Sequence, residues 1–217
     1  MNARFSTALL FALATATAGW CATTPPRAES KVDTRTIIFF GDSLTVGLGL
    51  REPADEAFPG LIQKKITAAH LAWRVINAGL SGETTSGGLR RVDWILRQPV
   101  DVFVLELGGN DGLRGIEPAV SRANLQGIID RVRAKNPAVK ILLAGMQMPP
   151  SLGPDYTSDF AAIYPELAEK NHVSLVPFLL DGVALDPELN QRDGIHPTAA
   201  GHRKVAETVW AYLLPLL

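Results

Sequence analysis

The chain has 217 residues, 47% of them hydrophobic and 20% charged, so it can form one domain with a large core and has the balance of a soluble protein. The formal net charge of -1 gives no electrostatic basis for binding nucleic acid or an anionic membrane. Cys21 is the only cysteine, which excludes an intramolecular disulfide and a fold that depends on oxidation.

The first 22 residues predict a secretory signal peptide. Arg4 precedes a short apolar run over residues 8–14, which is too short for a comfortable membrane span. Small residues follow, and three alanines are candidate cleavage positions: Ala16, Ala18 and Ala22. An uncleaved anchor is one alternative. Lipid attachment at Cys21 is another, disfavoured because Trp20 stands where a small residue is expected.

A tether and one folded domain are expected to follow. Residues 23–34 contain Pro25, Pro26 and several polar side chains, which predicts a disordered tether without chemistry of its own. Residues 35–217 show no internal repeat and no linker, so they predict a single domain. We expect a bacterial protein that is periplasmic or secreted, monomeric, and without a stable membrane span in the mature chain.

The domain begins with a short apolar strand that leads into a serine. Residues 37–40 are apolar and two of them are β-branched, which predicts a buried strand. Gly41 ends that pattern, and Asp42 and Ser43 are residue types that cap helices, so a helix is expected to begin here. Ser43 is therefore predicted at the carboxyl edge of a sheet and at a helix N-terminus, where the helix dipole favours negative charge.

Strands and helices alternate along the rest of the chain. Short apolar runs predict further strands, at residues 73–77, 102–107, 140–144 and 173–176. Helical spacing of apolar residues, or proline at a first turn, predicts helices at residues 59–69, 84–97, 118 onward, 155–170 and 198–213. Residues 46–57 predict a loop, and Pro165 is expected to kink or split its helix.

This alternation predicts an α/β fold, a single-domain three-layer α/β/α sandwich. Helices between consecutive strands favour a five-stranded parallel sheet that is covered on both faces. Right-handed crossovers and the strand order 2-1-3-4-5 would make the fold flavodoxin-like. Because the carboxyl ends of parallel strands meet at one edge, residues that follow different strands are expected to lie close together there.

Five residues at this edge form a pattern suited to acyl transfer. Ser43, Gly79 and Asn110 follow the first three strands, and Asp193 and His196 precede the last helix. A serine hydroxyl needs a base; His196 can be that base, and Asp193 can fix its tautomer. The backbone N–H groups of Ser43 and Gly79 and the side-chain amide of Asn110 can stabilise the oxyanion. The pattern predicts a reaction that needs no cofactor and no metal.

The same residues lie in four blocks, in this order along the chain: Gly41-Asp42-Ser43-Leu44, Gly79, Gly108-x-Asn110-Asp111 and Asp193-x-x-His196. Together the blocks resemble the SGNH (GDSL-type) hydrolase family over nearly all of the chain after residue 35. Longer matches at residues 106–115 and 193–197 resemble its bacterial periplasmic subgroup, which has thioesterase, lysophospholipase and arylesterase activities.

The resemblance implies catalytic roles for Ser43, Asp193 and His196, and an oxyanion hole formed by Ser43, Gly79 and Asn110. It implies a serine esterase that acts on a small acyl-ester or lipid-like substrate through an acyl-enzyme intermediate, without a cofactor. A carbohydrate O-deacetylase of the same fold is one alternative. A non-catalytic flavodoxin-like protein that binds a phosphate or flavin at the Ser43 turn is another, but it leaves Asn110, Asp193 and His196 unexplained.

Other motifs are incomplete. Residues 79–83 nearly match the Gly-x-Ser-x-Gly nucleophile elbow, but Glu83 stands at the last position, so Ser81 is interpreted as a loop residue. His70, His172 and His202 lack metal-ligand spacing, and we expect them at the surface or at helix caps.

Overall fold

The computed structural model describes Met1 and residues 34–217. The predicted signal peptide, Cys21 and nearly all of the predicted tether lie outside the described residues. The fold described is that of the unit Val32–Leu217. In this part of the chain, no helix has both the length and the apolar character needed to cross a membrane.

A five-stranded parallel sheet forms the centre of the fold. Its strands are β1 (Arg35–Gly41), β2 (Trp73–Asn77), β3 (Val102–Glu106), β4 (Lys140–Ala144) and β5 (Ser174–Val176). They are ordered β2-β1-β3-β4-β5, and every neighbouring pair is parallel. The predicted strand order and the three-layer fold class are therefore confirmed, and β1 and β3 lie at the middle of the sheet.

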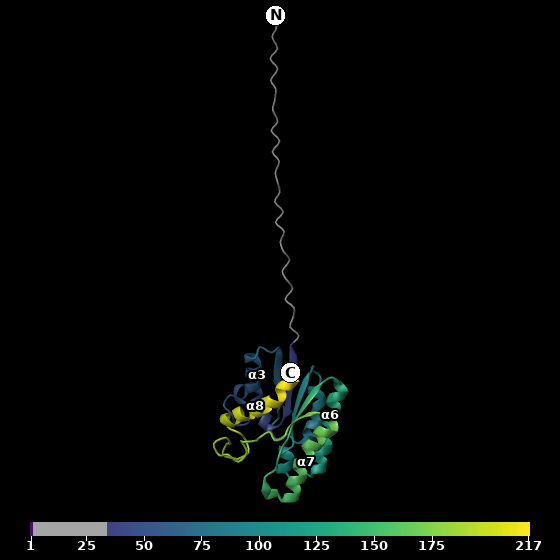
Figure 1. Ribbon diagram of the computed structural model, residues 1–217, viewed down its shortest axis with the longest axis vertical. Helices are drawn as coiled ribbons and strands as arrows, with labels where there is room; N and C mark the ends of the chain where they lie inside the picture. The colour runs from purple at the N-terminus through teal and green to yellow at the C-terminus, as the bar shows by residue number, and fades with distance from the viewer. Residues whose placement is uncertain (2–33) are drawn as a thin grey trace. The chain divides into compact units, whose positions relative to one another are not determined.

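Helices cover both faces of the sheet. Their bounds are α1 (Ser43–Val46), α2 (Pro53–Glu56), α3 (Phe58–Ala68), α4 (Thr85–Ile95), α5 (Gly109–Leu113), α6 (Pro118–Lys135), α7 (Pro154–Asn171) and α8 (Ala199–Leu213), with 3-10 turns η1 (Pro150–Leu152) and η2 (Leu214–Leu216). Figure 1 shows α3 beside α8 on one side of the sheet and α6 beside α7 on the other. Helix α4 packs against α6.

The core lies between the sheet and these helices. The four apolar residues of β1, Ile37, Ile38, Phe39 and Phe40, are fully buried, as a central parallel strand requires. The ring of Phe39 packs edge-on against Phe58 of α3, and Phe40 packs against Phe103 of β3. A rigid central strand therefore delivers the chain to Gly41 and Ser43.

Two local predictions need correction, and one short helix was not predicted. Residues 46–57 are not loop throughout, because α2 forms at Pro53, a residue suited to a first helical turn. The glycine-rich segment that follows β3 contains the short helix α5. Pro165 does not split α7, which is helical from Pro154 to Asn171. Buried side chains on both sides of this proline, including Phe160 and Leu167, keep the two halves of α7 packed on the core.

Candidate active site

Ser43 occupies a sharp turn between β1 and α1. The carboxylate of Asp42 caps α1 by accepting the backbone N–H of Leu44 at 2.9 Å, and Ser43 is the first helical residue. Gly41 is required before this turn, because a Cβ there would lie 2.1 Å from Thr45 Oγ1 and 2.7 Å from the Glu106 carbonyl oxygen. The turn thus holds the Ser43 backbone N–H at a helix N-terminus, where it has no acceptor within the helix.

Ser43, His196 and Asp193 form a continuous hydrogen-bonded chain. Ser43 Oγ lies 2.9 Å from His196 Nε2, and His196 Nδ1 lies 2.7 Å from Asp193 Oδ2. Asp193 Oδ1 also accepts the backbone N–H groups of Ile195 and His196. The bond from the His196 N–H is the main cause that lowers the pKa of Asp193 to about 2, so this carboxylate stays ionised near neutral pH.

The loop that carries Asp193 and His196 is braced by Gln191. The backbone N–H of Gln191 donates to the His196 carbonyl at 2.7 Å. Its side-chain Nε2 donates to the carbonyls of Leu48, at 2.7 Å, and Pro197, at 3.0 Å. Gln191 therefore links the segment after Ser43 with the segment around His196, two parts of the chain that are remote in sequence.

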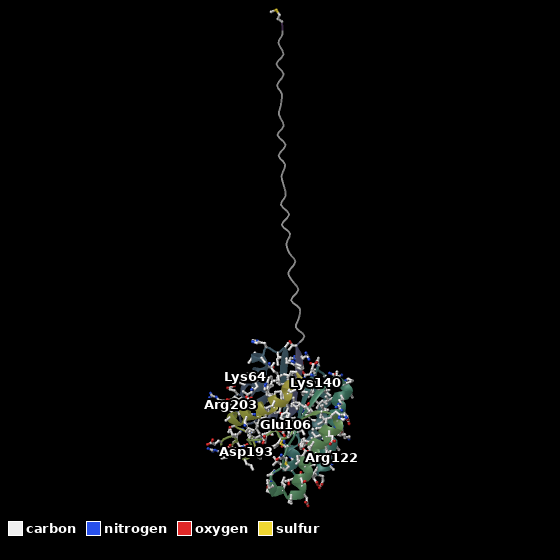
Figure 2. All side chains as sticks on the ribbon, viewed as in Figure 1. Lys64, Glu106, Arg122, Lys140, Asp193 and Arg203 are labelled. Carbon is white, nitrogen blue, oxygen red and sulfur yellow. The ribbon has the colours of Figure 1, made fainter. Side chains whose placement is uncertain are left out.

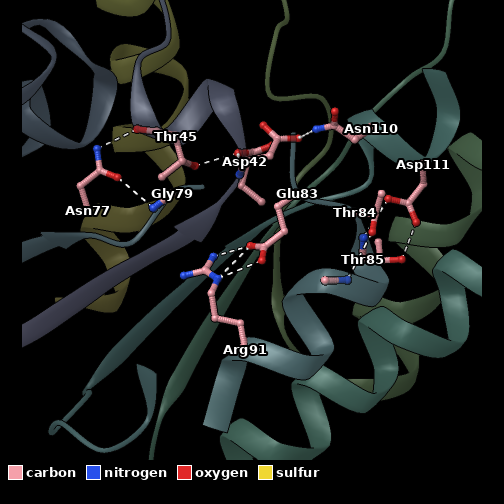
Figure 3. Close-up of polar contacts among 12 residues, drawn as sticks. Asp42, Thr45, Asn77, Gly79, Glu83, Thr84, Thr85, Arg91, Asn110 and Asp111 are labelled. Carbon is pink, nitrogen blue, oxygen red and sulfur yellow. Dashed lines mark hydrogen bonds and ion pairs between the residues drawn. The ribbon is translucent and has the colours of Figure 1, made fainter. Parts of the chain in front are cut away.

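Asn110 lies on α5, next to the Ser43 turn. Its Nδ2 donates to Asp42 Oδ2 at 3.0 Å, and Figure 3 shows the two side chains facing each other. The amide has a second N–H that this bond does not use. Asp42 therefore fixes how the Asn110 side chain is turned.

The structure places Gly79 against the same turn, but its N–H already has an acceptor. A Cβ at Gly79 would lie 2.5 Å from the Val46 backbone nitrogen, so the close approach requires glycine. The Gly79 N–H donates to Asn77 Oδ1 at 3.0 Å, and Asn77 Nδ2 donates to the Thr45 carbonyl at 2.8 Å (Figure 3). The N–H of Gly82, in the same turn, has no hydrogen bond among residues 34–217.

Two buried carboxyl groups lie beneath the nucleophile turn. Glu106, at the end of β3, is fully buried near the centre of the fold (Figure 2), and its Oε2 accepts from the Asp42 N–H at 3.2 Å and from Thr45 Oγ1 at 2.7 Å. Burial raises the pKa of Asp42 to about 6, and burial together with the Asp42 charge raises the pKa of Glu106 well above its usual range. Both shifts disfavour the charged forms of this carboxyl pair.

Asp111, next to Asn110, fastens α5 to its neighbours. Its buried carboxylate accepts the backbone N–H of Thr85 at 2.8 Å, the Thr85 hydroxyl, and the hydroxyl of Ser121 at 3.0 Å (Figure 3). Three donors from α4 and α6 thus hold the helix that carries Asn110. Asp111 therefore holds α5, and with it Asn110, in position from inside the fold.

An apolar pocket of about 390 Å³ opens beside Ser43. It is lined mainly by apolar side chains, among them Leu44, Leu113, Met148, Phe178 and Ile195. Most of these residues follow β3, β4 or β5, so the pocket lies over that half of the sheet edge. Its size and lining suit the hydrocarbon part of a small ligand.

Of the histidines outside this site, His202 differs from its prediction. It is buried, its Nδ1 accepts the Phe58 N–H at 3.3 Å, and burial lowers its pKa to about 4. His172 and His70 lie at the ends of α7 and α3 with positive φ, in agreement with cap roles. Among the described residues, no cluster of three or more acidic, histidine or cysteine side chains could hold a metal ion.

Comparison with known proteins identifies the family. The model of the GDSL-like Lipase/Acylhydrolase family matches residues 39–204, a span that includes Ser43, Asn110, Asp193 and His196. The chain belongs to this family. The sequence-based predictions of the family and of a serine ester hydrolase are confirmed.

Relatives of this GDSL-like hydrolase are bacterial esterases. Esterase TesA of Pseudomonas aeruginosa is 40% identical over 184 residues, which cover 84% of this chain and 90% of the relative. Thioesterase 1/protease 1/lysophospholipase L1 of Escherichia coli K12 is 38% identical over 187 residues, 84% of this chain and 85% of the relative. The crystal structure of TesA superimposes with a TM-score of 0.80 over 84% of this chain and 100% of that one.

Sequence reasoning missed two supporting residues of this GDSL-like hydrolase, Gln191 and Glu106. No sequence motif marks Gln191, because its role depends on two carbonyl groups that lie close together only in the folded protein. The burial of Glu106 was signalled by its place at the end of an apolar strand, but its contact with the Asp42 turn was not. Asp42, predicted from the sequence as a helix cap, caps α1 and also accepts a hydrogen bond from the Asn110 amide.

Proposed function

We propose that this GDSL-like hydrolase cleaves carboxylic esters with Ser43 as nucleophile, His196 as base and Asp193 as the partner that holds His196 in the required tautomer. The carrying observation is the hydrogen-bonded chain from Ser43 Oγ through the imidazole to the Asp193 carboxylate, with distances of 2.9 and 2.7 Å. This is the geometry that converts a weakly nucleophilic hydroxyl into an attacking group.

The reaction proceeds in two steps. His196 Nε2 takes the proton of Ser43 Oγ as the oxygen attacks the ester carbonyl, and the resulting intermediate expels the alcohol or thiol, which receives that proton from His196. The acyl group is then bound to Ser43 as an ester. Water, deprotonated by the same imidazole, attacks this ester and releases the carboxylic acid, and the proton returns to Ser43.

The oxyanion is stabilised by N–H groups around the Ser43 turn. The backbone N–H of Ser43 and the second N–H of the Asn110 amide are two donors, and Asp42 holds that amide in place. The third donor was expected at Gly79. Because the Gly79 N–H is engaged by Asn77 and that of Gly82 is free in the described residues, we assign the third donor to the 79–82 turn, with Gly82 as the stronger candidate.

The substrates we propose carry an apolar acyl group. The pocket beside Ser43, about 390 Å³ in volume and lined by Leu113, Met148 and Phe178, can hold a hydrocarbon chain. The relatives' names support carboxylic esters, aryl esters, thioesters and lysophospholipids as the range to test.

A carbohydrate O-deacetylase remains the second candidate function. A carbohydrate esterase from Clostridium thermocellum shares the fold with a TM-score of 0.69, but at 22% identity this likeness concerns the fold alone. An acetyl group would leave most of the apolar pocket unfilled. Hydrolysis rates for acetylated sugars and for medium-chain esters of the same alcohol separate the two functions.

Replacing the nucleophile tests the proposal. Ser43→Ala should abolish ester hydrolysis while thermal unfolding stays close to that of the wild type, since a small change in a turn costs little stability. A fluorophosphonate should label the wild type on Ser43 and leave the variant unlabelled, as read by mass spectrometry. Full activity of the variant would refute the assignment.

We also infer export of the protein by its N-terminal signal peptide. The basic start, the apolar run and the alanines up to Ala22 support this, as does the bacterial source of the relatives. Cell fractionation with the full chain and with a form that starts at residue 23 provides the test. Equal distribution of both forms between cytoplasm and periplasm would contradict export.

A further inference from the structure

A second, polar recess lies beside the 79–82 turn, apart from the apolar pocket. It has a volume of about 490 Å³ and is lined by the turn after β2, by the first part of α4 and by Arg114 at the end of α5. Its charged side chains are three arginines, Arg90, Arg91 and Arg114, and one acid, Glu83. The proposed catalytic steps do not use any of these four residues.

The single acid of this arginine recess is already neutralised. Glu83, which is buried, forms a bidentate ion pair with Arg91 (Figure 3). The Arg91 guanidinium also lies over the Phe40 ring at 4.2 Å from its centre. These contacts hold the Arg91 side chain in place, and Glu83 neutralises its positive charge. Its role is to hold the wall of the recess.

The other two arginines have no acidic partner within residues 34–217. Arg114 donates to the Gly82 carbonyl at 2.9 Å, which aims its guanidinium into the recess, and Arg90 is exposed on α4. The recess therefore presents two arginine side chains whose positive charges are not matched by an acid among the described residues.

The strand order indicates where the two pockets lie relative to the ester bond that is cleaved. The recess lies after β2, Ser43 follows β1, Asn110 follows β3, and the apolar pocket lies after β3, β4 and β5. In addition, the Leu80 N–H donates to the Gly41 carbonyl at 2.9 Å, which joins the recess to the nucleophile turn. An ester bound at Ser43 thus has an apolar pocket on one side and two free arginines on the other.

We propose that the arginine recess binds a phosphate group on the leaving-group side of the substrate, while the acyl chain occupies the apolar pocket. Arginine is suited to this role because its planar N–H groups match the oxygens of phosphate. The inference rests on the proposed esterase function and names a substrate class for it: acyl esters or thioesters whose alcohol or thiol carries phosphate.

The test compares substrates that differ only in phosphate. The ratio of kcat/KM for lysophosphatidic acid to that for the monoacylglycerol of the same chain, both below their micelle concentrations, should favour the phosphate ester in the wild type. Arg90→Gln should lower this ratio about threefold and Arg90→Gln/Arg114→Gln about tenfold, mostly through KM, as expected for exposed ion pairs. The preference should also weaken with added salt.

A second pair of substrates distinguishes the source of the phosphate. Acyl-coenzyme A and the acyl thioester of N-acetylcysteamine share the reacting bond, and only the first carries phosphate. An arginine-dependent preference in the glycerol pair identifies a lipid headgroup, and one in the thioester pair identifies a phosphorylated thiol carrier; either supports the proposal. A wild type without preference in both pairs, or ratios unchanged in the double variant, would overturn it.

Three controls keep this result separate from other effects. Arg203→Gln removes the same charge from α8, on the opposite face of the sheet (Figure 2), and should leave both ratios unchanged. Arg114→Lys keeps a donor for the Gly82 carbonyl and should restore most of the preference. Arg203→Gln should also keep the wild-type rate on the monoacylglycerol; if the wild type cleaves no ester at all, the proposed function fails rather than the recess.

Discussion

Asp42 is the residue at which stability and function conflict most clearly. Its carboxyl is buried next to a second carboxyl, that of Glu106, and burial raises its pKa to about 6. The same carboxylate caps α1 and orients the Asn110 amide. The protein therefore keeps a poorly solvated carboxylate at Asp42, because this carboxylate holds the proposed oxyanion donor Asn110 in position.

Asp42→Asn should separate these two effects. The folded state holds the Asp42 proton more tightly than the unfolded state, whose pKa is near 3.8, so wild-type stability falls as the pH rises from about 4 to about 6. The amide at position 42 in the variant does not titrate. The free energy of unfolding of the variant minus that of the wild type, both measured in urea, should therefore increase by on the order of 2–3 kcal/mol between the lower and the upper end of this pH window.

The activity of the same variant should fall. An amide at position 42 offers N–H groups to Asn110 Nδ2 where the carboxylate accepted, so kcat should drop by up to about 10²–10³, the usual cost of losing an oxyanion donor. Asn110→Ala, which removes the donor itself, gives the reference value for kcat. Parallel stability curves for Asp42→Asn and wild type, or unchanged kcat, would contradict this account.

His202 predicts an opposite dependence on pH. Burial lowers its pKa to about 4, below the 6.5 of the unfolded chain, so the unfolded state binds the proton more tightly. Its contribution to stability is complete above about pH 6.5 and is lost as the pH falls toward 4. His202→Gln should flatten the acid side of the stability curve, as measured by urea unfolding at several pH values.

At the scale of whole elements, α7 offers a direct test of its internal proline. Pro165 is exposed in the middle of a continuous helix and cannot donate the N–H that the carbonyl of Ala161 would accept. Pro165→Ala should raise the free energy of unfolding by about 1–3 kcal/mol, measured in urea. Glu166→Ala, at the neighbouring exposed position, should change it by less than about 1 kcal/mol. A neutral or destabilising effect of Pro165→Ala would show that α7 depends on the proline.

The sequence predicted the elements that bury regular apolar patterns. The five strands and the long helices follow from runs such as Ile37–Phe40 and from helical spacing, because burial of those faces dominates the folding free energy. The strand order 2-1-3-4-5 was predicted from the flavodoxin-like arrangement that such an alternation can adopt. It could therefore be predicted that Ser43 and the loop that carries Asp193 lie at the same edge of the sheet.

The details that escaped prediction depend on contacts between distant segments. Helix α5 is fixed by three hydrogen bonds to Asp111 from Thr85 and Ser121, which no local propensity indicates. The engagement of the Gly79 N–H depends on the side chain of Asn77. His202 looked like a surface residue because its burial depends on packing of α8 against Phe58.

At the scale of the whole molecule, the proposed chemistry uses only groups of the chain itself. Every proton transfer is assigned to Ser43 and His196, and charge stabilisation to N–H donors. Prolonged dialysis against a chelator should therefore leave kcat for a neutral ester unchanged within about twofold. Addition of Zn²⁺, Mg²⁺ or Ca²⁺ to the dialysed protein should have no larger effect. A loss of activity that one of these ions restores would refute the mechanism.

The separation of 153 residues between Ser43 and His196 has a consequence for biosynthesis. The nucleophile leaves the ribosome early, and its base follows only after most of the domain has been synthesised, directly before the segment that forms α8. A nascent or truncated chain that lacks this part carries the serine without the imidazole that activates it. Hydrolysis therefore begins only after synthesis has passed His196 and the domain has folded as a unit.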